Sequence, residues 1–322
     1  SITPLAALRE RAGPGTAVLY ERALATTRDR STSGFRRAVA LAEAADVTVV
    51  FVGEEAILSG EGHSRADIAL PGAQLELVRQ LKATGKPVVA VVLAGRPLTL
   101  EDLADAADAI LFAWHPGAMG GPAIADLLFG QASPSGRLPV SFPRMVGQLP
   151  LYYNQKNTGK PPSPASMVLI DDIEAHARQL SVGMTAYHLD AGYRPLYPFG
   201  FGLSYGDFAY RDLALSSAVI PAGGSLEASI VLTNRGTMAA TEVVQLYVRD
   251  LAGSVTRPVR ELKDFRRVHL GAGESTTVTF RLHSDQLAFH GRDMRLRTEP
   301  GAFHLWIGPD AEAGLRTGFQ VQ

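Results

Sequence analysis

The chain has 322 residues, of which 46% are hydrophobic and 20% are charged, with a formal net charge of -1 and no cysteine. This balance is typical of a soluble globular protein of about two domains. It provides no cationic field for nucleic acid or for a membrane surface, so we expect neither as a partner. The absence of cysteine excludes disulfides, thiolate catalysis and thiolate metal sites.

The first part of the chain alternates apolar runs with amphipathic stretches. The runs are nearly continuous, as in parallel strands covered on both faces, and the stretches space their apolar residues three and four apart. We predict strands at Val47–Val52, Val88–Leu93 and Ala109–Ala113, and helices at Phe35–Ala45, Ala73–Ala83 and Gly121–Phe129. This order predicts an α/β fold with a mostly parallel sheet flanked by helices, and functional residues in the loops at the carboxyl ends of the strands.

The second part of the chain has a different residue pattern. Residues 155–206 lose regular periodicity and accumulate Pro, Gly and Ser, which indicates a long connecting segment that packs on the α/β domain. Later strand-like runs, separated by turn signals, predict a β-sandwich. These runs are Leu226–Leu232, Glu242–Val248, Ser275–Leu282 and Ala302–Ile307. We therefore expect an α/β domain at residues 1–154, a connection at 155–206 and an all-β sandwich at 207–322.

The sequence lacks several familiar signals. No uninterrupted apolar run reaches the roughly 18 residues of a spanning helix, and the first residues do not resemble a signal peptide. The α/β part has no dinucleotide fingerprint or P-loop, and the histidines show no ligand spacing, so we expect no cofactor and no metal. Gly202–Gly206 matches the nucleophile-elbow pattern G-x-S-x-G but lacks the strand before it and the helix after it, so we interpret it as a hinge.

The loop Gly53–Arg65, read GEEAILSGEGHSR, follows the first predicted strand and holds the main candidate for chemistry. Glu61 stands between two glycines, which add no bulk and allow close approach to a ligand. A carboxylate so placed suits proton transfer to an oxygen leaving group. The alternative is a solvated loop in which Glu61 and Arg65 form a surface ion pair of little consequence.

The neighbours of Glu61 have alternative roles. Glu54 lies directly at the strand end, where a carboxylate often accepts hydrogen bonds from the backbone or from arginine, so we expect a structural or binding role for it in preference to proton transfer. His63 is a hydrogen-bonding neighbour or a sugar contact. Trp114 follows the third predicted strand and either lines a pocket or covers the sheet.

Several segments together resemble the C-terminal part of glycoside hydrolase family 3, the β-glucosidases and their relatives. They are VGEEAILSGEGHSRADIALPGAQ, KPVVAVVLAGRPL, WHPGAMGGPAIADLLFGQASPSGRLPVSFPRMVGQLPLYY, NTGKP and LYPFGFGLSYGDF. EVVQLYVRDLAGSVTRPVRELKDF, GAGES and EPGAFHLWIG resemble the fibronectin type III-like domain of that family. The segments Lys160–Met184 and Thr185–Asp190 depart from the family pattern, so sugar contacts from them are not carried over.

The resemblance implies that Glu61 is the general acid/base of a retaining β-glucosidase that removes terminal β-D-glucosyl residues. Glu54, His63, Arg65 and Trp114 are the substrate-binding candidates around it. The family places the aspartate nucleophile on a preceding (β/α)8-type barrel, and this chain contains no such repetition. We therefore expect an N-terminal barrel domain or chain as partner and a β-glucoside or oligosaccharide as substrate.

Alternatives stay open. The same role in a β-xylosidase, a non-catalytic carbohydrate-binding or scaffolding module, and a free-standing flavodoxin-like or esterase domain are competing hypotheses. The oligomeric state is open, with a homodimer as one alternative. The resemblance points to a periplasmic or secreted bacterial enzyme.

Overall fold

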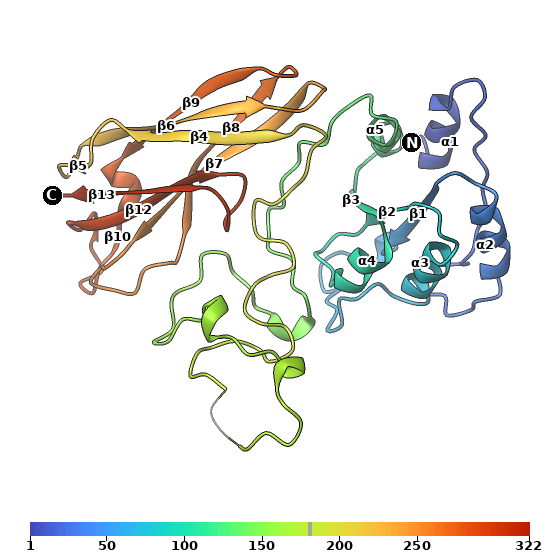
Figure 1. Ribbon diagram of the computed structural model, residues 1–322, viewed down its shortest axis with the longest axis horizontal. Helices are drawn as coiled ribbons and strands as arrows, with labels where there is room; N and C mark the ends of the chain where they lie inside the picture. The colour runs from blue at the N-terminus through green and yellow to red at the C-terminus, as the bar shows by residue number, and fades with distance from the viewer. Residues whose placement is uncertain (180–181) are drawn as a thin grey trace. The chain divides into compact units, whose positions relative to one another are not determined.

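The computed structural model describes residues 1–179 and 182–322, and the chain divides in it into two compact units (Figure 1). The first, the α/β unit, comprises Ser1–Ala132 and Phe142–Leu149. The second, the sandwich unit, comprises Ser133–Ser141 and Pro150–Gln322. Residues 180 and 181, which fall in the Lys160–Met184 segment, lie outside the described residues.

A parallel sheet forms the centre of the α/β unit. Its strands are β1 (Thr48–Gly53), β2 (Val88–Leu93) and β3 (Ala109–Phe112), in the order β1-β2-β3. Their register aligns the carboxyl ends, since Gly53 pairs with Leu93 and Val92 with Phe112. The predicted strands and the parallel α/β fold class are confirmed.

Burial differs between the strands of this sheet. Val88, Ala90, Val91 and Val92 of β2 are fully buried, as expected for a strand covered on both faces. In β1, however, Phe51 is 37% exposed, and β3 has no fully buried residue. Coverage on both faces is therefore complete for the central strand β2 and only partial for the edge strands β1 and β3, so the expectation is wrong for these two strands.

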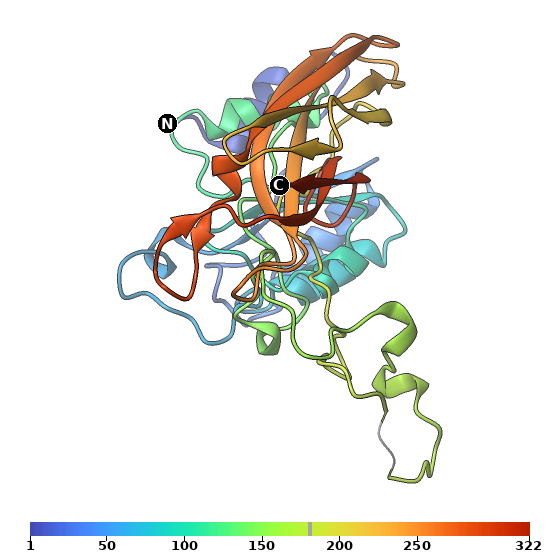
Figure 2. The ribbon, with the colours of Figure 1, turned by 90° about the vertical axis from the view of Figure 1, so that its left-hand side faces the viewer.

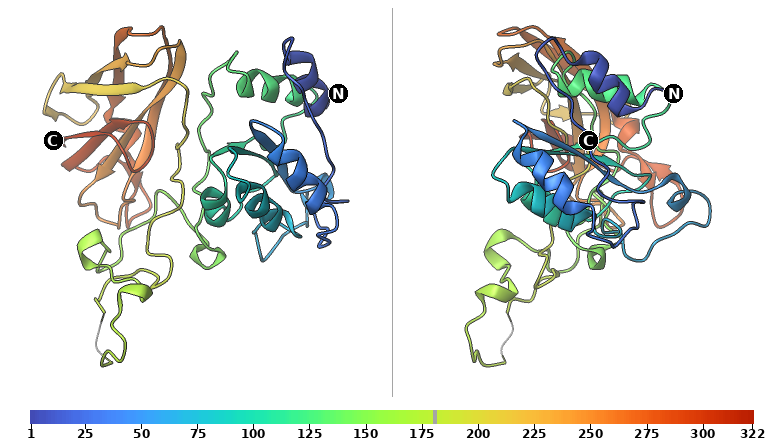
Figure 3. Two further views of the ribbon diagram at one scale, coloured as in Figure 1. Left: turned by 45° about the vertical axis from the view of Figure 1, so that its right-hand side comes forward. Right: turned by 90° about the vertical axis from the view of Figure 1, so that its right-hand side faces the viewer.

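Helices lie on both sides of the sheet. They are α1 (Pro4–Arg11), α2 (Phe35–Glu43), α3 (Gln74–Lys82), α4 (Glu101–Ala106) and α5 (Gly120–Leu128). Figure 3 shows α1 and α5 side by side on one side of the sheet and α2, α3 and α4 on the other. The three predicted helices are confirmed as α2, α3 and α5. Helix α1 begins with a Thr3 cap that accepts the Ala6 N–H at 3.2 Å, followed by proline at the first helical position.

The sandwich unit is built from two sheets of mostly antiparallel strands and a small hairpin. The strand orders are β5-β13-β12-β7-β8 and β4-β6-β9 in the sheets and β10-β11 in the hairpin. The strands are β4 (Phe208–Leu215), β5 (Val219–Ile220), β6 (Ser225–Asn234), β7 (Ala240–Asp250), β8 (Glu261–Leu270), β9 (Ser275–His283), β10 (Phe289–His290), β11 (Leu296–Arg297), β12 (Gly301–Gly308) and β13 (Leu315–Val321). Alternate residues of β6 are buried, as expected for one core-facing side. The four predicted strand runs are confirmed as β6, β7, β9 and β12.

Both sheets contribute to one apolar core. Leu232 of β6, Leu246 of β7 and Phe280 of β9 are almost fully buried in it, and Phe303 stacks on Phe319 with centroids 5.1 Å apart. At roughly 25 cal/mol per Å² of buried apolar surface, such side chains provide most of the driving force for this fold. The predicted β-sandwich is confirmed.

Most of the connection between α5 and β4, residues 133–141 and 150–207, groups with the sandwich unit. The described regular elements between α5 and β4 are short 3-10 turns at Val146–Gln148, Pro164–Ser166 and Ile170–Asp172. Figure 2 shows the light green part of this connection, which carries the last two turns, projecting away from the sandwich sheets. The stacked rings of Tyr153 and Phe199, 4.2 Å apart, pack against buried Tyr247 of β7. The predicted boundaries at residues 154 and 206 stay predictions.

Candidate active site

The loop that carries Glu61 leaves β1 at the carboxyl end of the parallel sheet. The Glu54 N–H still donates to the Leu93 carbonyl of β2 at 2.7 Å, and a 3-10 turn at Ala56–Leu58 follows. Arg65 closes the loop, because its Nη1 lies 2.6 Å from Oε1 of Glu54. The two ends of the loop therefore meet at the carboxyl end of the sheet, next to the end of β1.

The Glu54 carboxylate is completely buried and doubly paired. Its side chain is 0% exposed, and Arg96 Nε donates to the second oxygen, Oε2, at 3.0 Å. A buried carboxylate is tolerated only when its charge is paired and hydrogen-bonded, and here both oxygens are occupied by guanidinium groups. This geometry favours the anchoring role of Glu54 over direct contact with a sugar.

Arg96 was not among the residues selected from the sequence. It follows β2, and its Nη2 donates to the carbonyls of Leu58 and His63, the latter at 2.9 Å. Arg65 similarly uses its Nη2 for the Ala69 carbonyl at 2.9 Å. One feature of the sequence could have identified Arg96 as a candidate, namely its position just after the strand next to β1, at the carboxyl end of the sheet.

Glu61 stands at the tip of the loop in a tight turn. The His63 N–H donates to the Gly60 carbonyl at 3.1 Å, and the flanking glycines have φ values of 142° and 77°. Such positive angles strain other residues, which explains the glycine on each side. Within residues 1–179 and 182–322, no side chain pairs with the exposed Glu61 carboxylate, and Arg65 pairs with Glu54 instead. The Glu61 carboxylate is therefore presented to solvent.

His63 is exposed beside this turn. Its ring packs over Gly60, with Nδ1 3.5 Å from the place where a Cβ would lie. The structure thus places the His63 ring next to Gly60, the residue before Glu61, and leaves His63 exposed.

The loops after all three parallel strands meet at Gly95. A Cβ at this position would lie 2.1 Å from Oγ of Ser59 and 2.6 Å from Nε2 of His115. Ser59 belongs to the Glu61 loop and His115 follows β3. Glycine at position 95 therefore allows the Glu61 loop to pack closely on its neighbours.

We expect Gly95→Ala to destabilise the α/β unit by about 1–3 kcal/mol, because the new methyl group has no space. Urea denaturation measures this change. Gly13→Ala is the matched control, since a Cβ at Gly13 meets nothing within 4 Å and its effect should stay within about 0.5 kcal/mol. Equal stability of both variants would contradict the close packing at Gly95.

Trp114 lies just beyond β3 in a strained conformation with φ 52°. Its half-buried indole makes edge-to-face contacts with Phe112 and Phe142, at centroid distances of 4.7 and 5.9 Å. Such contacts stabilise aromatic clusters beyond their buried area. Of the two roles predicted for Trp114, covering the end of the sheet has direct support in these contacts.

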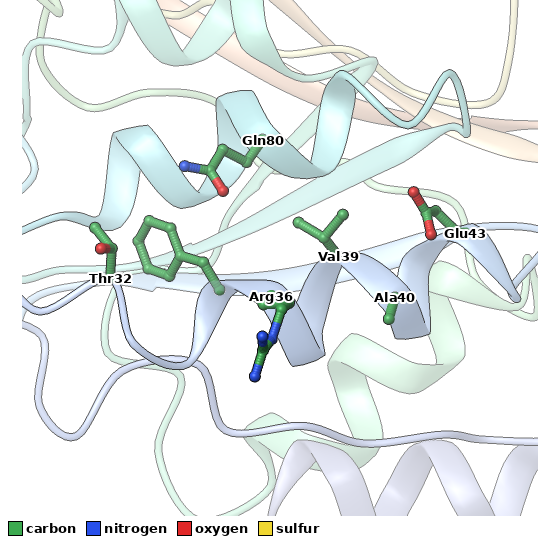
Figure 4. Close-up of a pocket in the computed structure, with 7 residues that line it drawn as sticks. Thr32, Arg36, Val39, Ala40, Glu43 and Gln80 are labelled. Carbon is green, nitrogen blue, oxygen red and sulfur yellow. The ribbon is translucent and has the colours of Figure 1, made fainter.

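Two surface cavities lie away from this loop. One of about 440 Å³ lies between α2 and α3 and is lined by Thr32, Phe35, Arg36, Val39, Ala40, Glu43 and Gln80 (Figure 4). Another of about 820 Å³ in the sandwich unit is lined largely by residues 249–257. Neither lining contains a site residue predicted from the sequence.

Across the described ranges, no group of three or more His, Asp or Glu side chains could hold a metal ion. None of the described helices is long and apolar enough to cross a membrane. Gly202–Gly206 leads into β4 instead of a helix, so it lacks the context of a nucleophile elbow.

Comparison with protein families gives two matches along this chain. Residues 1–205 match the model described as glycosyl hydrolase family 3 C-terminal domain, and residues 242–311 match the fibronectin type III-like domain. Together these matches cover the parallel sheet, the Glu61 loop and most of the sandwich core.

Curated relatives share substantial identity. A protein from Salmonella typhimurium named periplasmic beta-glucosidase is 38% identical over 340 residues, covering 100% of this chain and 43% of that protein. A protein from Formosa agariphila named beta-xylosidase is 38% identical over 283 residues, covering 88% of this chain and 36% of that protein. The chain thus spans less than half the length of these relatives.

Solved structures agree with this picture. A beta-glucosidase from Listeria innocua in complex with gluconolactone has a TM-score of 0.87 and 35% identity, covering 99% of this chain and 42% of that chain. A GH3 beta-glucosidase from Bifidobacterium adolescentis has a TM-score of 0.78 and 29% identity, covering 98% of this chain and 45% of that one.

Proposed function

Since the chain belongs to glycosyl hydrolase family 3, we propose that it supplies Glu61 as the general acid/base of a retaining β-glucosidase. The observation that carries the proposal is the placement of Glu61. It is an exposed carboxylate with no side-chain partner in the described part of the chain, on a tight turn at the carboxyl end of a parallel sheet.

A retaining hydrolase needs two carboxylates. One attacks the anomeric carbon and forms a covalent glycosyl-enzyme, while the other protonates the leaving oxygen and then removes a proton from the incoming water. We assign the second task to Glu61. The first belongs to an aspartate on a barrel domain or chain N-terminal to this one, and the greater length of the relatives supports that assignment.

The residues around Glu61 take different parts in this proposal. Glu54 and Arg65 hold the loop, because their charges are already paired with each other. His63 is the candidate for a hydrogen bond to the sugar, since its ring is exposed beside the turn. Trp114 is a candidate for contact with the sugar ring through the part of the indole that its aromatic neighbours leave exposed.

We expect the chain alone to release no product from 4-nitrophenyl β-D-glucoside. The reason is that the covalent intermediate requires the nucleophile, which we place on the barrel. The complete enzyme, meaning this chain together with its barrel, should release nitrophenol, and the barrel should copurify with this chain when the two are separate polypeptides. A partner-free chain with full activity would overturn the division of the site.

The substrate we propose is a terminal β-D-glucosyl residue. A β-xyloside is the second candidate, favoured by the relative named beta-xylosidase. A site that hydrogen-bonds the glucose hydroxymethyl group should prefer the aryl glucoside over the aryl xyloside by at least about tenfold in kcat/KM. A faster reaction with the xyloside would reverse this choice.

We also propose a periplasmic or secreted location, supported by the name of the Salmonella relative. A homodimer stays a prediction.

A further inference from the structure

We propose that Arg96 is a positioning residue that holds the Glu61 loop in one conformation by bracing both of its arms. The guanidinium donates to the Leu58 carbonyl on the arm before Glu61 and to the His63 carbonyl on the arm after it. The kinetic part of this inference rests on the proposed function of Glu61, whereas the structural part does not.

The brace is anchored to the sheet at its other end. Nε of Arg96 donates to Oε2 of Glu54 at 3.0 Å, and the Glu54 N–H is bonded to β2. The Arg96 side chain is itself only 19% exposed. One guanidinium group therefore links the end of β1 with both arms of the loop that extends from it.

Arginine is suited to this task because its planar group presents several donors in a fixed geometry. Lysine keeps the positive charge for Glu54, but its single ammonium cannot reproduce the planar fork that spans the three acceptors. Arg96→Lys therefore separates the bracing of the loop from charge neutralisation at Glu54.

Gly95 adds a second constraint beside Arg96. The close approach of Ser59 at Gly95 holds the preceding arm against the loop after β2. Arg96 donates to the loop carbonyls and Ser59 packs against Gly95. Two separate contacts therefore hold the turn that carries Glu61. A loop so held presents the carboxylate in one place, which proton transfer requires.

Hydrogen exchange in this chain tests the brace without any reference to activity. Arg96→Lys should speed exchange of the Leu58, Ser59 and His63 amides by about tenfold or more, since a lost hydrogen bond to a charged donor corresponds to at least that factor. The Val91 amide in β2 should not change. Unchanged exchange in the loop would overturn the proposal.

Arg79→Lys is the matched control, because Arg79 of α3 forms an exposed ion pair with Asp102 of α4 and, within the described residues, its side chain has no bond to the Glu61 loop. It should leave the exchange of the loop as it is. Arg96→Gln serves as the second variant if Arg96→Lys folds poorly, and it should produce the same local increase. A uniform increase across the whole α/β unit in both Arg96 variants would indicate general destabilisation and would also overturn the proposal.

A double-mutant cycle in the complete enzyme tests whether the brace acts through Glu61. Arg96→Lys should lower kcat/KM, which reports the first step, about tenfold or more for glucosides with poor leaving groups, and much less for those with good ones. In a Glu61→Gln background the same change should have no further effect. An equal loss in both backgrounds would overturn the positioning role. If Glu61→Gln alone had no effect, the proposed function would fail while the exchange result would still decide the brace.

Discussion

Glu61→Gln in the complete enzyme is expected to lower kcat/KM for alkyl β-glucosides by about 10²–10⁴-fold, the usual contribution of a general acid/base. Glutamine has nearly the same shape and can hydrogen-bond, but it cannot transfer a proton. In aryl glucosides with good leaving groups, the aryloxide departs without protonation, so the first step should slow much less for these substrates. A series of aryl glucosides with different leaving-group pKa values measures this difference.

Glu55→Gln is the matched control for this prediction. Glu55 lies in the same loop, but its carboxylate forms an ion pair with Arg28 at 2.8 Å. It should change kcat/KM by less than about fivefold, because surface ion pairs contribute about 0–1 kcal/mol. Equal losses for good and poor leaving groups in Glu61→Gln would contradict proton transfer by Glu61.

Glu242→Ala is expected to destabilise the sandwich unit by about 3–5 kcal/mol, the usual effect of removing one partner of a buried ion pair. Nη2 of Arg137 binds both carboxylate oxygens of Glu242, at 2.7 and 2.8 Å, and the two side chains are only 8% and 5% exposed. The Tyr210 hydroxyl also donates to Glu242 at 3.1 Å. Burial raises the pKa of Tyr210, with the nearby Glu242 charge adding to it, so this hydroxyl stays protonated as a donor.

Urea denaturation measures this change in the free energy of unfolding. The chain has two tryptophans, so a Trp114→Phe background leaves the fluorescence of Trp306 in β12 to report on the sandwich unit. Asp207→Ala, which removes an exposed ion pair with Arg235 in the same unit, is the control and should change stability by no more than about 1 kcal/mol. A loss of similar size in both variants would contradict a structural role for the buried pair.

The sequence predicted the fold where local patterns are strong. The strands of the parallel sheet are continuous apolar runs, and the predicted helices have clear three-and-four spacing. Helix α1 was missed because it buries only Ala7 and so has no apolar stripe, and α4 was missed because its 6 residues are too few for a periodic pattern.

Several strands of the sandwich were also missed, for physical reasons. Strand β8 reads ELKDFRRVHL and buries only its last residue fully, so it lacks an apolar run. Strand β4 has a register shift between Arg211 and Ala214, with φ 58° at Asp212, which breaks the alternation of side chains.

The candidate site was likewise predicted from the sequence only in part. Glu61 was selected because its glycine neighbours and its position after a strand are visible in the sequence. Arg96 was missed because its partners lie up to 42 residues away and meet it only through the parallel register of β1 and β2. The pairing of Arg65 with Glu54 instead of Glu61 likewise depends on how the loop folds back on the sheet.

The assignment of Glu61 as acid/base is tested most directly by the configuration of the glucosyl azide that Glu61→Gln forms from an activated aryl β-glucoside in the presence of azide. Azide needs no proton removed, so it can attack the covalent glucosyl-enzyme from the face opposite the nucleophile. We predict the β-anomer, identified by the anomeric proton coupling in NMR. Formation of the α-anomer, or of no azide product at all, would contradict the assignment.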